Sequence, residues 1–316
     1  MASPSSYATA KQVFLADVVQ NLFDDNSFLA RSRNASAFAN NKTVNWNQAG
    51  AKPEVIIDRD TTALTPAKRT DILRNFDLQE YQSQPTIIDW TDEYVINYSK
   101  RASVLEDHIS QVSEDLALRI LYNWISGASA IIRTTGTAKA GEAPGATGNR
   151  LGISYNDIVN ARKVLNKQNI PQLNRCMLIS ANTEATILAL DEFKSRDKYG
   201  AMTMMDGAIG TIAGFSVFVR SSTTVFNNAA TPVAKLFKAN DTFTPAATAV
   251  TDNESSLFWS ADNVVRAVSI EGVSGSRINI VPAHGADEFS LTLVAGGAKY
   301  RNAGEGIVAL VEAASA

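Results

Sequence analysis

The spacing of apolar residues changes several times along the chain, and its clearest stretch is helical. From Ser103 to Ser126, apolar residues recur at steps of three or four, which places them on one face of a helix. They are Leu105, Ile109, Val112, Leu116, Ile120 and Trp124. Ser103 followed by Glu106 predicts a capping box, and Gly127 is placed to end the helix. At 1.5 Å per residue this helix is roughly 36 Å long, so we expect a structural spine.

The N-terminal part of the chain offers little apolar material for a core. Residues 1–45 are polar and rich in Asn, Ser and Ala, with one helical patch from Thr9 to Arg31, so we expect an arm that packs on something else. Residues 46–90 carry short strand-like runs around the polar middle RDTTALTPAKRTD. This pattern predicts a long hairpin with little core of its own.

Helix and strand patterns then alternate in the middle of the chain. Ser154 followed by Asp157 predicts a second capped helix, which stops before Pro171. A buried strand, CMLISA, and a short helix opened by Asn182 follow. This order is typical of a mixed α/β domain.

Two segments are predicted to be loops, and the end of the chain is predicted to be β-rich. The Gly- and Ala-rich residues 134–150 indicate an exposed flexible loop, and the polar residues 223–256 indicate a surface excursion. From Leu257 onward, strand patterns return in LFWSADNVVRAVSI, RINIVPA, FSLTLVAGGAKY and GIVALVEA.

The glycines of the stretch DGAIGTIAGFSVFVRSS, at 207, 210 and 214, raise the question of a phosphate-binding loop. A dinucleotide fingerprint needs G-x-G-x-x-G between a strand and a helix, so that the helix N-terminus meets the pyrophosphate. Here the spacing is G-x-x-G-x-x-x-G, and an alternating strand pattern follows. We therefore expect a turn in which glycine permits a positive φ before a strand.

Composition narrows the possible classes of protein. The 316 residues are 45% hydrophobic and 19% charged, with a net charge of −3 and a pI of about 5.5. This is not the basic body of a protein that wraps nucleic acid. No apolar run is long enough for a transmembrane helix, and no secretory signal pattern opens the chain, so we expect no membrane partner and a protein that stays where it is made.

Candidate nucleophiles and metal ligands are scarce. Cys176 is the only cysteine, which excludes an internal disulfide, and its apolar surroundings indicate a small buried side chain. His108 lies on the predicted spine helix and His284 in a predicted loop, with no H-x-x-x-H pairing for a metal. A triad of His284 with a remote serine stays open, although no G-x-S-x-G motif accompanies it.

Charged and aromatic residues also have simpler explanations than catalysis. Acidic residues that are close in sequence suit exposed faces and helix caps, and an acid/base couple or a cation site is the alternative. These groups are Asp24 with Asp25, Asp89 with Asp92 and Glu93, Glu106 with Asp107, and Glu114 with Asp115. The short basic clusters at 68–70, 99–101 and 194–198 suit contacts between charged partners, and the four scattered tryptophans suit cores or interfaces. We predict no catalytic, cofactor-binding or metal-binding residue.

Three segments carry a resemblance to a known family. The family's helix, strand and short helix resemble the segment IPQLNRCMLISANTEATILALDEF. Its glycine turn that leads into a strand resembles IGTIAGFSVFVRSS, and its last strands resemble AGGAKYRNAGEGIVALVEA. With the arm, hairpin and spine helix, this order resembles the major capsid proteins of tailed bacteriophages, which have the Hong Kong 97-like or Johnson fold. The resemblance covers nearly the whole chain.

The resemblance implies an α+β fold with named parts. Residues 1–45 would be the N-terminal arm and 46–90 the extended β-hairpin loop. Residues 91–133 and 262–316 would form the peripheral domain with the spine helix, and 151–261 the axial α/β domain. Residues 134–150 would be a flexible loop at the subunit edge.

The family's function needs no active site, so the resemblance implies a structural protein and not an enzyme. Such subunits form hexamers and pentamers that close into an icosahedral shell around double-stranded DNA, first in the host cytoplasm and then in the virion capsid. Implied partners are other copies, a portal protein, a separate scaffolding protein, decoration proteins and weakly held DNA. Some members of the family crosslink their subunits through a bond between Lys and Asn. Here Lys68 lies in the predicted extended loop and Asn302 in the predicted peripheral domain. No sequence motif marks either residue for this bond, so we expect no crosslink.

Two other functions remain possible from the sequence. Encapsulin compartments share the fold and enclose enzymes in place of DNA. An α/β enzyme of unknown chemistry is the alternative from another class, and it would be a soluble monomer or dimer that binds a small ligand.

Overall fold

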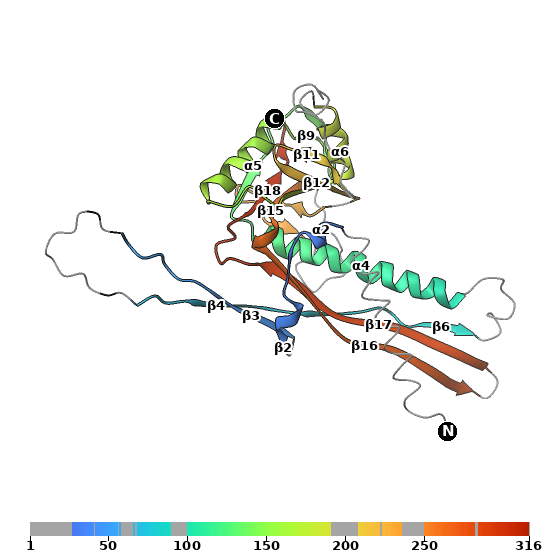
Figure 1. Ribbon diagram of the computed structural model, residues 1–316. Helices are drawn as coiled ribbons and strands as arrows, with labels where there is room; N and C mark the ends of the chain where they lie inside the picture. The colour runs from blue at the N-terminus through green and yellow to red at the C-terminus, as the bar shows by residue number, and fades with distance from the viewer. Residues whose placement is uncertain are drawn as a thin grey trace.

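The lower part of the molecule is built from one long helix and a pair of long strands. The computed structural model describes residues 27–40, 42–55, 57, 66, 68–89, 100–190, 208–221, 223–235, 250–281 and 284–315. Helix α4 (Lys100–Ser126) lies along the antiparallel pair β16 (Val264–Val281) and β17 (His284–Lys299), as Figure 1 shows. Its buried face includes five predicted residues, namely Ile109, Val112, Leu116, Ile120 and Trp124.

The predicted start of this helix is wrong. The helix begins at Lys100, so Ser103 lies within its first turn and does not cap it. Lysine, arginine and alanine, the first three helical residues, all have high helix propensity, and nothing in them stops the helix short of Ser103. The end of the helix before Gly127 is confirmed.

The paired long strands form the centre of the lower sheet. β1 (Arg33–Asn34) pairs with β16 in parallel, while β5 (Gln79–Gln82) and β6 (Thr86–Asp89) both pair antiparallel with β17. Residues 79–82 and 86–89, which the resemblance assigns to the extended loop, are therefore strands of this sheet. His284, expected in a loop, is the first residue of β17 and pairs with Val281.

The predicted long hairpin is confirmed by β3 (Thr43–Gln48) and β4 (Ile72–Asp77), which pair antiparallel next to the short β2 (Ala39–Asn40). The hairpin projects away from the rest of the molecule (Figure 1). Trp46 fixes its base, because its ring stacks on Tyr300 at 5.7 Å and its Nε1 donates to the Tyr300 carbonyl oxygen at 3.1 Å.

The upper part contains a mixed sheet flanked by helices α5 (Tyr155–Lys167) and α6 (Ala181–Leu188) (Figure 1). Within the described residues, the main path of this sheet runs β11-β12-β10-β15-β13-β14, and β18 joins β15 to β7. The strands are β7 (Ala130–Arg133), β10 (Arg175–Ser180), β11 (Ala208–Ile212), β12 (Phe215–Arg220), β13 (Val225–Phe226), β14 (Ala234–Lys235), β15 (Asn253–Ser260) and β18 (Ile307–Val311).

Both helices of the upper part are capped by serine. The predicted capping box of Ser154 and Asp157 is present at the start of α5. The short helix begins earlier than expected, because Ser180 at the end of β10 accepts a hydrogen bond from the Thr183 N–H at 3.1 Å. Asn182 therefore lies inside α6 and does not open it.

Both predicted loops contain ordered strands. In residues 134–150, β8 (Ala138–Ala140) pairs with β9 (Asn149–Leu151), which continues to β19 (Ala313–Ala314). In residues 223–256, the described residues from Thr223 to Phe226 and from Asp252 to Ser256 are buried. Their polar side chains bond to backbone or to other side chains: the Thr223 hydroxyl donates to the Ser255 carbonyl at 2.6 Å, and Lys235 pairs with the Asp252 carboxylate at 2.8 Å. Polar composition therefore did not mean exposure here.

The glycine segment is a β-hairpin and not a phosphate loop. β11 and β12 pair antiparallel around a turn in which Ala213 and Gly214 have φ of 48° and 83°. Gly210, with φ of 129°, lies at an irregularity in the register of β11. The expectation of positive φ before a strand is confirmed, although a second strand precedes the turn; Gly207 lies outside the described residues.

An aromatic cluster connects the upper and lower parts. Phe28 of helix α2 (Ser27–Ala30) contacts Trp124 of α4 edge-to-face at 6.1 Å and Trp259 of β15 at 6.5 Å. Two short 3-10 turns, Ser36–Phe38 and Ala261–Asn263, complete the described elements. None of the helices described is at once long and apolar enough to span a membrane.

Gly304 gives a test of how the segment after β17 meets the end of α4. Its φ is 69°, and a Cβ there would lie 1.9 Å from the Gly127 carbonyl oxygen. We expect Gly304→Ala to lower the free energy of unfolding by about 3 kcal/mol or more, measured by urea denaturation.

Gly148→Ala is the matched control for this substitution. Gly148 also has a positive φ, of 80°, but its nearest neighbour to a new Cβ is Arg150 Nη1 at 3.7 Å. Gly148→Ala should therefore lower the free energy of unfolding by about 1 kcal/mol, which is the cost of the left-handed backbone conformation alone. Equal losses in the two variants would contradict the close approach at Gly304.

Candidate functional site

Three glutamates from distant parts of the chain meet beside the upper sheet. Glu254 is the second residue of β15, Glu312 follows β18, and Glu142 follows β8. Each offers one carboxylate oxygen, and these oxygens lie within 4.8 Å of one another. Glu254 and Glu312 are buried, with exposed fractions of 6% and 5%.

The pairing of two strands brings Glu254 and Glu312 together. β15 and β18 are antiparallel, with Ser255 opposite Val311, so the residues just beyond this pair face each other. The Glu254 N–H donates to Glu312 Oε2 at 3.0 Å, and the Glu312 N–H donates to the Glu254 carbonyl at 3.0 Å. The backbone therefore fixes one oxygen of Glu312.

One lysine accompanies the three carboxylates. Lys139 Nζ lies 2.5 Å from Glu142 Oε2 and 3.6 Å from Glu312 Oε1. A small cavity of about 10 Å³ lies between Lys139, Glu254 and Glu312, and this is about the least space that holds one water molecule. Among the described residues, Glu254 Oε2 and Glu312 Oε1 have no hydrogen-bond partner.

The electrostatics of the cluster favour protonated carboxyl groups. Burial, assisted by the negative charges of Glu312 and Glu142, raises the pKa of Glu254 to about 7, while the Ser180 hydroxyl and Lys139 oppose the rise. Burial likewise raises the pKa of Glu312, against the opposing Glu254 N–H and Lys139. Ionising both carboxyl groups in one desolvated space is unfavourable, because the two negative charges repel each other and neither is well solvated.

Sequence reasoning missed this cluster because it compared acidic residues that are neighbours in sequence. Glu254 and Glu312 stand at the edges of the apolar strand runs NESSLFWS and IVALVEA, and a carboxylate next to a buried strand was the available signal. The neighbouring pairs behave as expected where described: Glu106, Asp107 and Glu114 are exposed on α4. Asp24, Asp25, Asp92, Glu93 and the Asp89 side chain lie outside the description.

The other candidate residues are scattered. Cys176 is buried in β10, where desolvation raises the pKa of its thiol to about 12, which confirms the interpretation as a buried side chain. His108 Nε2 is buried in α4 without a hydrogen-bond partner in the described part of the chain. The His284 side chain is not described. Lys68 and Asn302 are both exposed.

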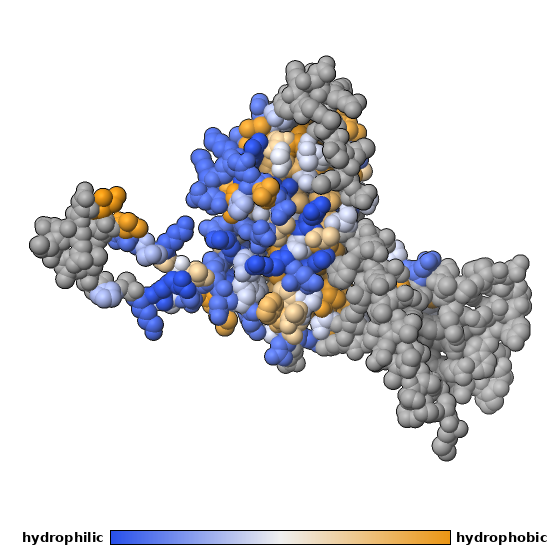
Figure 2. All heavy atoms as spheres, in the orientation of Figure 1, coloured by the Kyte–Doolittle hydropathy of each residue, from blue (hydrophilic) through white to orange (hydrophobic). Residues whose placement is uncertain are grey.

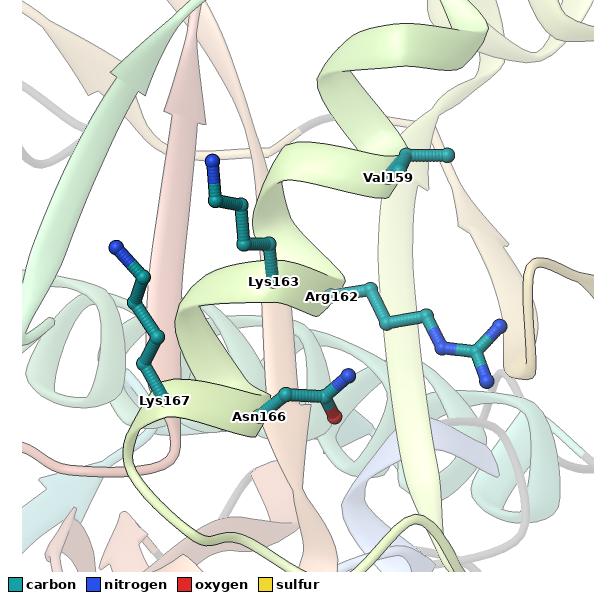
Figure 3. Close-up of a pocket in the computed structure, with 5 residues that line it drawn as sticks. All are labelled: Val159, Arg162, Lys163, Asn166 and Lys167. Atoms are coloured by element: carbon teal, nitrogen blue, oxygen red, sulfur yellow. The ribbon is translucent and has the colours of Figure 1, made fainter.

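A basic surface that the sequence patterns did not predict lies on α5. Arg162, Lys163 and Lys167 project from one side of α5 around a shallow, open hollow that Val159 and Asn166 also line (Figure 3). Arg69, in a predicted basic cluster, pairs instead with Asp71 at 2.7 Å, and residues 194–198 lie outside the description.

Comparison with solved structures identifies the fold. The chain is similar to the capsid of Cyanophage P-SCSP1u, with 13% identity, a TM-score of 0.63, and coverage of 90% of this chain and 87% of that one. A structure of Mycobacterium phage Che8 matches with 17% identity, a TM-score of 0.55, and coverage of 93% and 90%. A virus-like particle from Pyrococcus furiosus matches with 8% identity, a TM-score of 0.52, and coverage of 95% and 99%.

Sequence comparison alone finds nothing similar: no protein-family model matches the chain, and neither does any curated protein. The expected resemblance is confirmed at the level of the fold, since the structural matches to tailed-phage capsids extend over most of the chain.

The glutamate cluster predicts how stability depends on pH. The folded-state pKa of Glu254, about 7, is above its ordinary value of 4.5. Protonation of Glu254 therefore stabilises the folded state; this contribution to the free energy of unfolding is complete below pH 4.5 and is lost as the pH rises through 7. In chelator-containing buffer, we expect the free energy of unfolding to fall between pH 5 and pH 8 by on the order of 2 kcal/mol.

Two glutamine variants test this dependence by urea denaturation at each pH. Glu254→Gln should remove most of the fall and be more stable than the native chain at pH 8, because a neutral amide can donate to Glu312. Glu106→Gln, an exposed control on α4, should keep the full dependence. A Glu254→Gln profile parallel to the native one would show that another group titrates.

Proposed function

We propose that this chain is a major capsid protein that assembles as hexamers and pentamers into an icosahedral shell around double-stranded DNA. The observation that carries the proposal is the match of about nine-tenths of the chain to solved capsid structures of phages. Such a protein acts through its surfaces, so it has no need of the catalytic groups that the sequence analysis sought and did not find.

The projecting hairpin supports assembly through a second observation. Val55 and Ile57 are each 82% exposed, Leu73 is 67% exposed, and the nearby Phe38 is 69% exposed. Figure 2 shows apolar residues at the surface of this hairpin, far from the core. A two-stranded hairpin alone is marginally stable in water, so we infer that neighbouring copies cover these side chains.

The proposed partners follow from this role. Copies of the chain bind one another, and a portal protein, a scaffolding protein and decoration proteins complete the particle. The net charge of −3 favours only weak contact with the enclosed DNA. The protein then belongs to the virion capsid and, before assembly, to the host cytoplasm, with residues 1–45 as its arm and the hairpin of β3 and β4 as its extended loop.

A second candidate is the shell of an encapsulin-type compartment that encloses enzymes. The similarity to the virus-like particle from Pyrococcus furiosus over 95% of this chain favours it. The contents of purified particles separate the two: nuclease-resistant DNA supports the capsid, and a packaged enzyme supports the compartment.

Assembly itself is tested by analytical ultracentrifugation and negative-stain microscopy of the full chain, with and without a candidate scaffolding protein. Capsomers or closed shells of megadalton mass are expected. A species that stays near the 34.0 kDa of the single chain under every condition would overturn the proposal.

Leu73 offers a substitution at the proposed contact between copies. We expect Leu73→Asp to abolish capsomers and shells while leaving the melting temperature of the subunit within about 2 °C, because an exposed side chain contributes little to folding. Leu73→Met is the matched control and should still assemble, since it keeps an apolar side chain of similar volume. Normal shells from Leu73→Asp would exclude this strand from the contact.

A further inference from the structure

We propose that Glu142, Glu254 and Glu312 form a binding site for one calcium ion. The site lies where β15, the residue after β18 and the segment after β8 meet. It departs from the sequence-based expectation of no metal ligand, and it does not depend on whether the chain forms a shell.

The charge of the cluster calls for another cation. When all three carboxyl groups are ionised, the one lysine leaves two negative charges unbalanced, and two of the carboxylates are more than nine-tenths buried. Uncompensated charge in such a place is costly unless it is paired or coordinates a metal. One divalent ion balances the cluster.

The chemistry of the cluster favours calcium over magnesium. Two oxygens on one Ca²⁺, at 2.3–2.6 Å each, lie at most roughly 5 Å apart, whereas around Mg²⁺ at 2.0–2.1 Å the limit is roughly 4 Å. The three glutamate oxygens lie within 4.8 Å of one another, so small side-chain shifts bring them onto one Ca²⁺, which accepts irregular geometry, whereas Mg²⁺ demands a near-ideal octahedron and keeps several waters. Carboxylate oxygens are also the ligands that calcium prefers.

Unsatisfied oxygens already point to a ligand. Within the described residues, Glu254 Oε2 is buried and lacks a hydrogen-bond partner, and Glu254 lines the small cavity next to Glu312. Thr183 and Ser256, which carry hydroxyl oxygens, line the same space. An ion at this point would use the Glu254 oxygen that the described part of the chain leaves without a hydrogen-bond donor.

Lys139 and protons are the competitors of the ion. The ammonium group contacts Glu142 and Glu312, and its side chain is 20% exposed, so it can withdraw toward solvent on its flexible stem. A proton shared between Glu254 and Glu312 would satisfy the same two oxygens. At pH 8 most carboxyl groups are ionised, so a calcium titration at this pH reduces the competition from protons and leaves Lys139 as the main competitor.

The test is isothermal titration of the full, chelator-treated chain with CaCl₂ at pH 8, together with thermal melting. We expect one ion per chain with a Kd of about 10⁻⁴ M, as for weak calcium sites with few charged ligands. The melting temperature should rise with CaCl₂ and stay unchanged in NaCl of equal ionic strength. MgCl₂ should bind more weakly.

Variants assign the binding to the cluster. Glu254→Gln should weaken calcium binding at least tenfold, and Glu142→Gln, at a partly exposed position with little risk to folding, should do the same. Glu106→Gln on α4 should bind as the native chain does. Native protein that shows no heat and no melting shift with about 5 mM CaCl₂, or variants that bind unchanged, would overturn the proposal and leave the cluster a proton site or a structural ion pair.

Discussion

The packing of Trp124, Trp259 and Phe28 is the contact on which the arrangement of the two parts depends. Trp124 comes from the long helix, Trp259 from strand β15 of the upper sheet, and Phe28 from helix α2. Both indole N–H groups are satisfied, by the carbonyls of Val265 and Arg31. Large aromatic side chains with bonded polar atoms bury much area without a desolvation cost, so three distant segments are held in one core.

β15 then transmits this fixed position to the glutamate cluster. Its C-terminal end carries Trp259 in the aromatic core, and its N-terminal end carries Glu254. The pairing with β18 places Glu312 beside Glu254, while the hairpin of β8 and β9 supplies Lys139 and Glu142. A polar site thus lies at the far end of the strand whose apolar end is most firmly packed.

The sequence predicts elements with a strong local signal and misses those that depend on distant partners. The apolar face of α4 and the capping box of α5 follow from residues three or four apart, and both are confirmed. The strands in 134–150 and the buried polar residues near Thr223 were missed, because their burial comes from backbone acceptors on segments far along the chain. The glutamate cluster was missed for the same reason, since Glu142 and Glu312 are joined only by the fold.

The single buried cysteine has a practical consequence for labelling chemistry. Cys176 lies in the middle of the upper sheet, and its thiol stays protonated at neutral pH because desolvation raises its pKa. The thiolate is the form that reacts with maleimides and other electrophiles, so the native chain reacts with them only very slowly. A cysteine introduced on the exposed hairpin would be the only reactive thiol, and a fluorophore or crosslinker attached there would report on that one position without removal of the native residue.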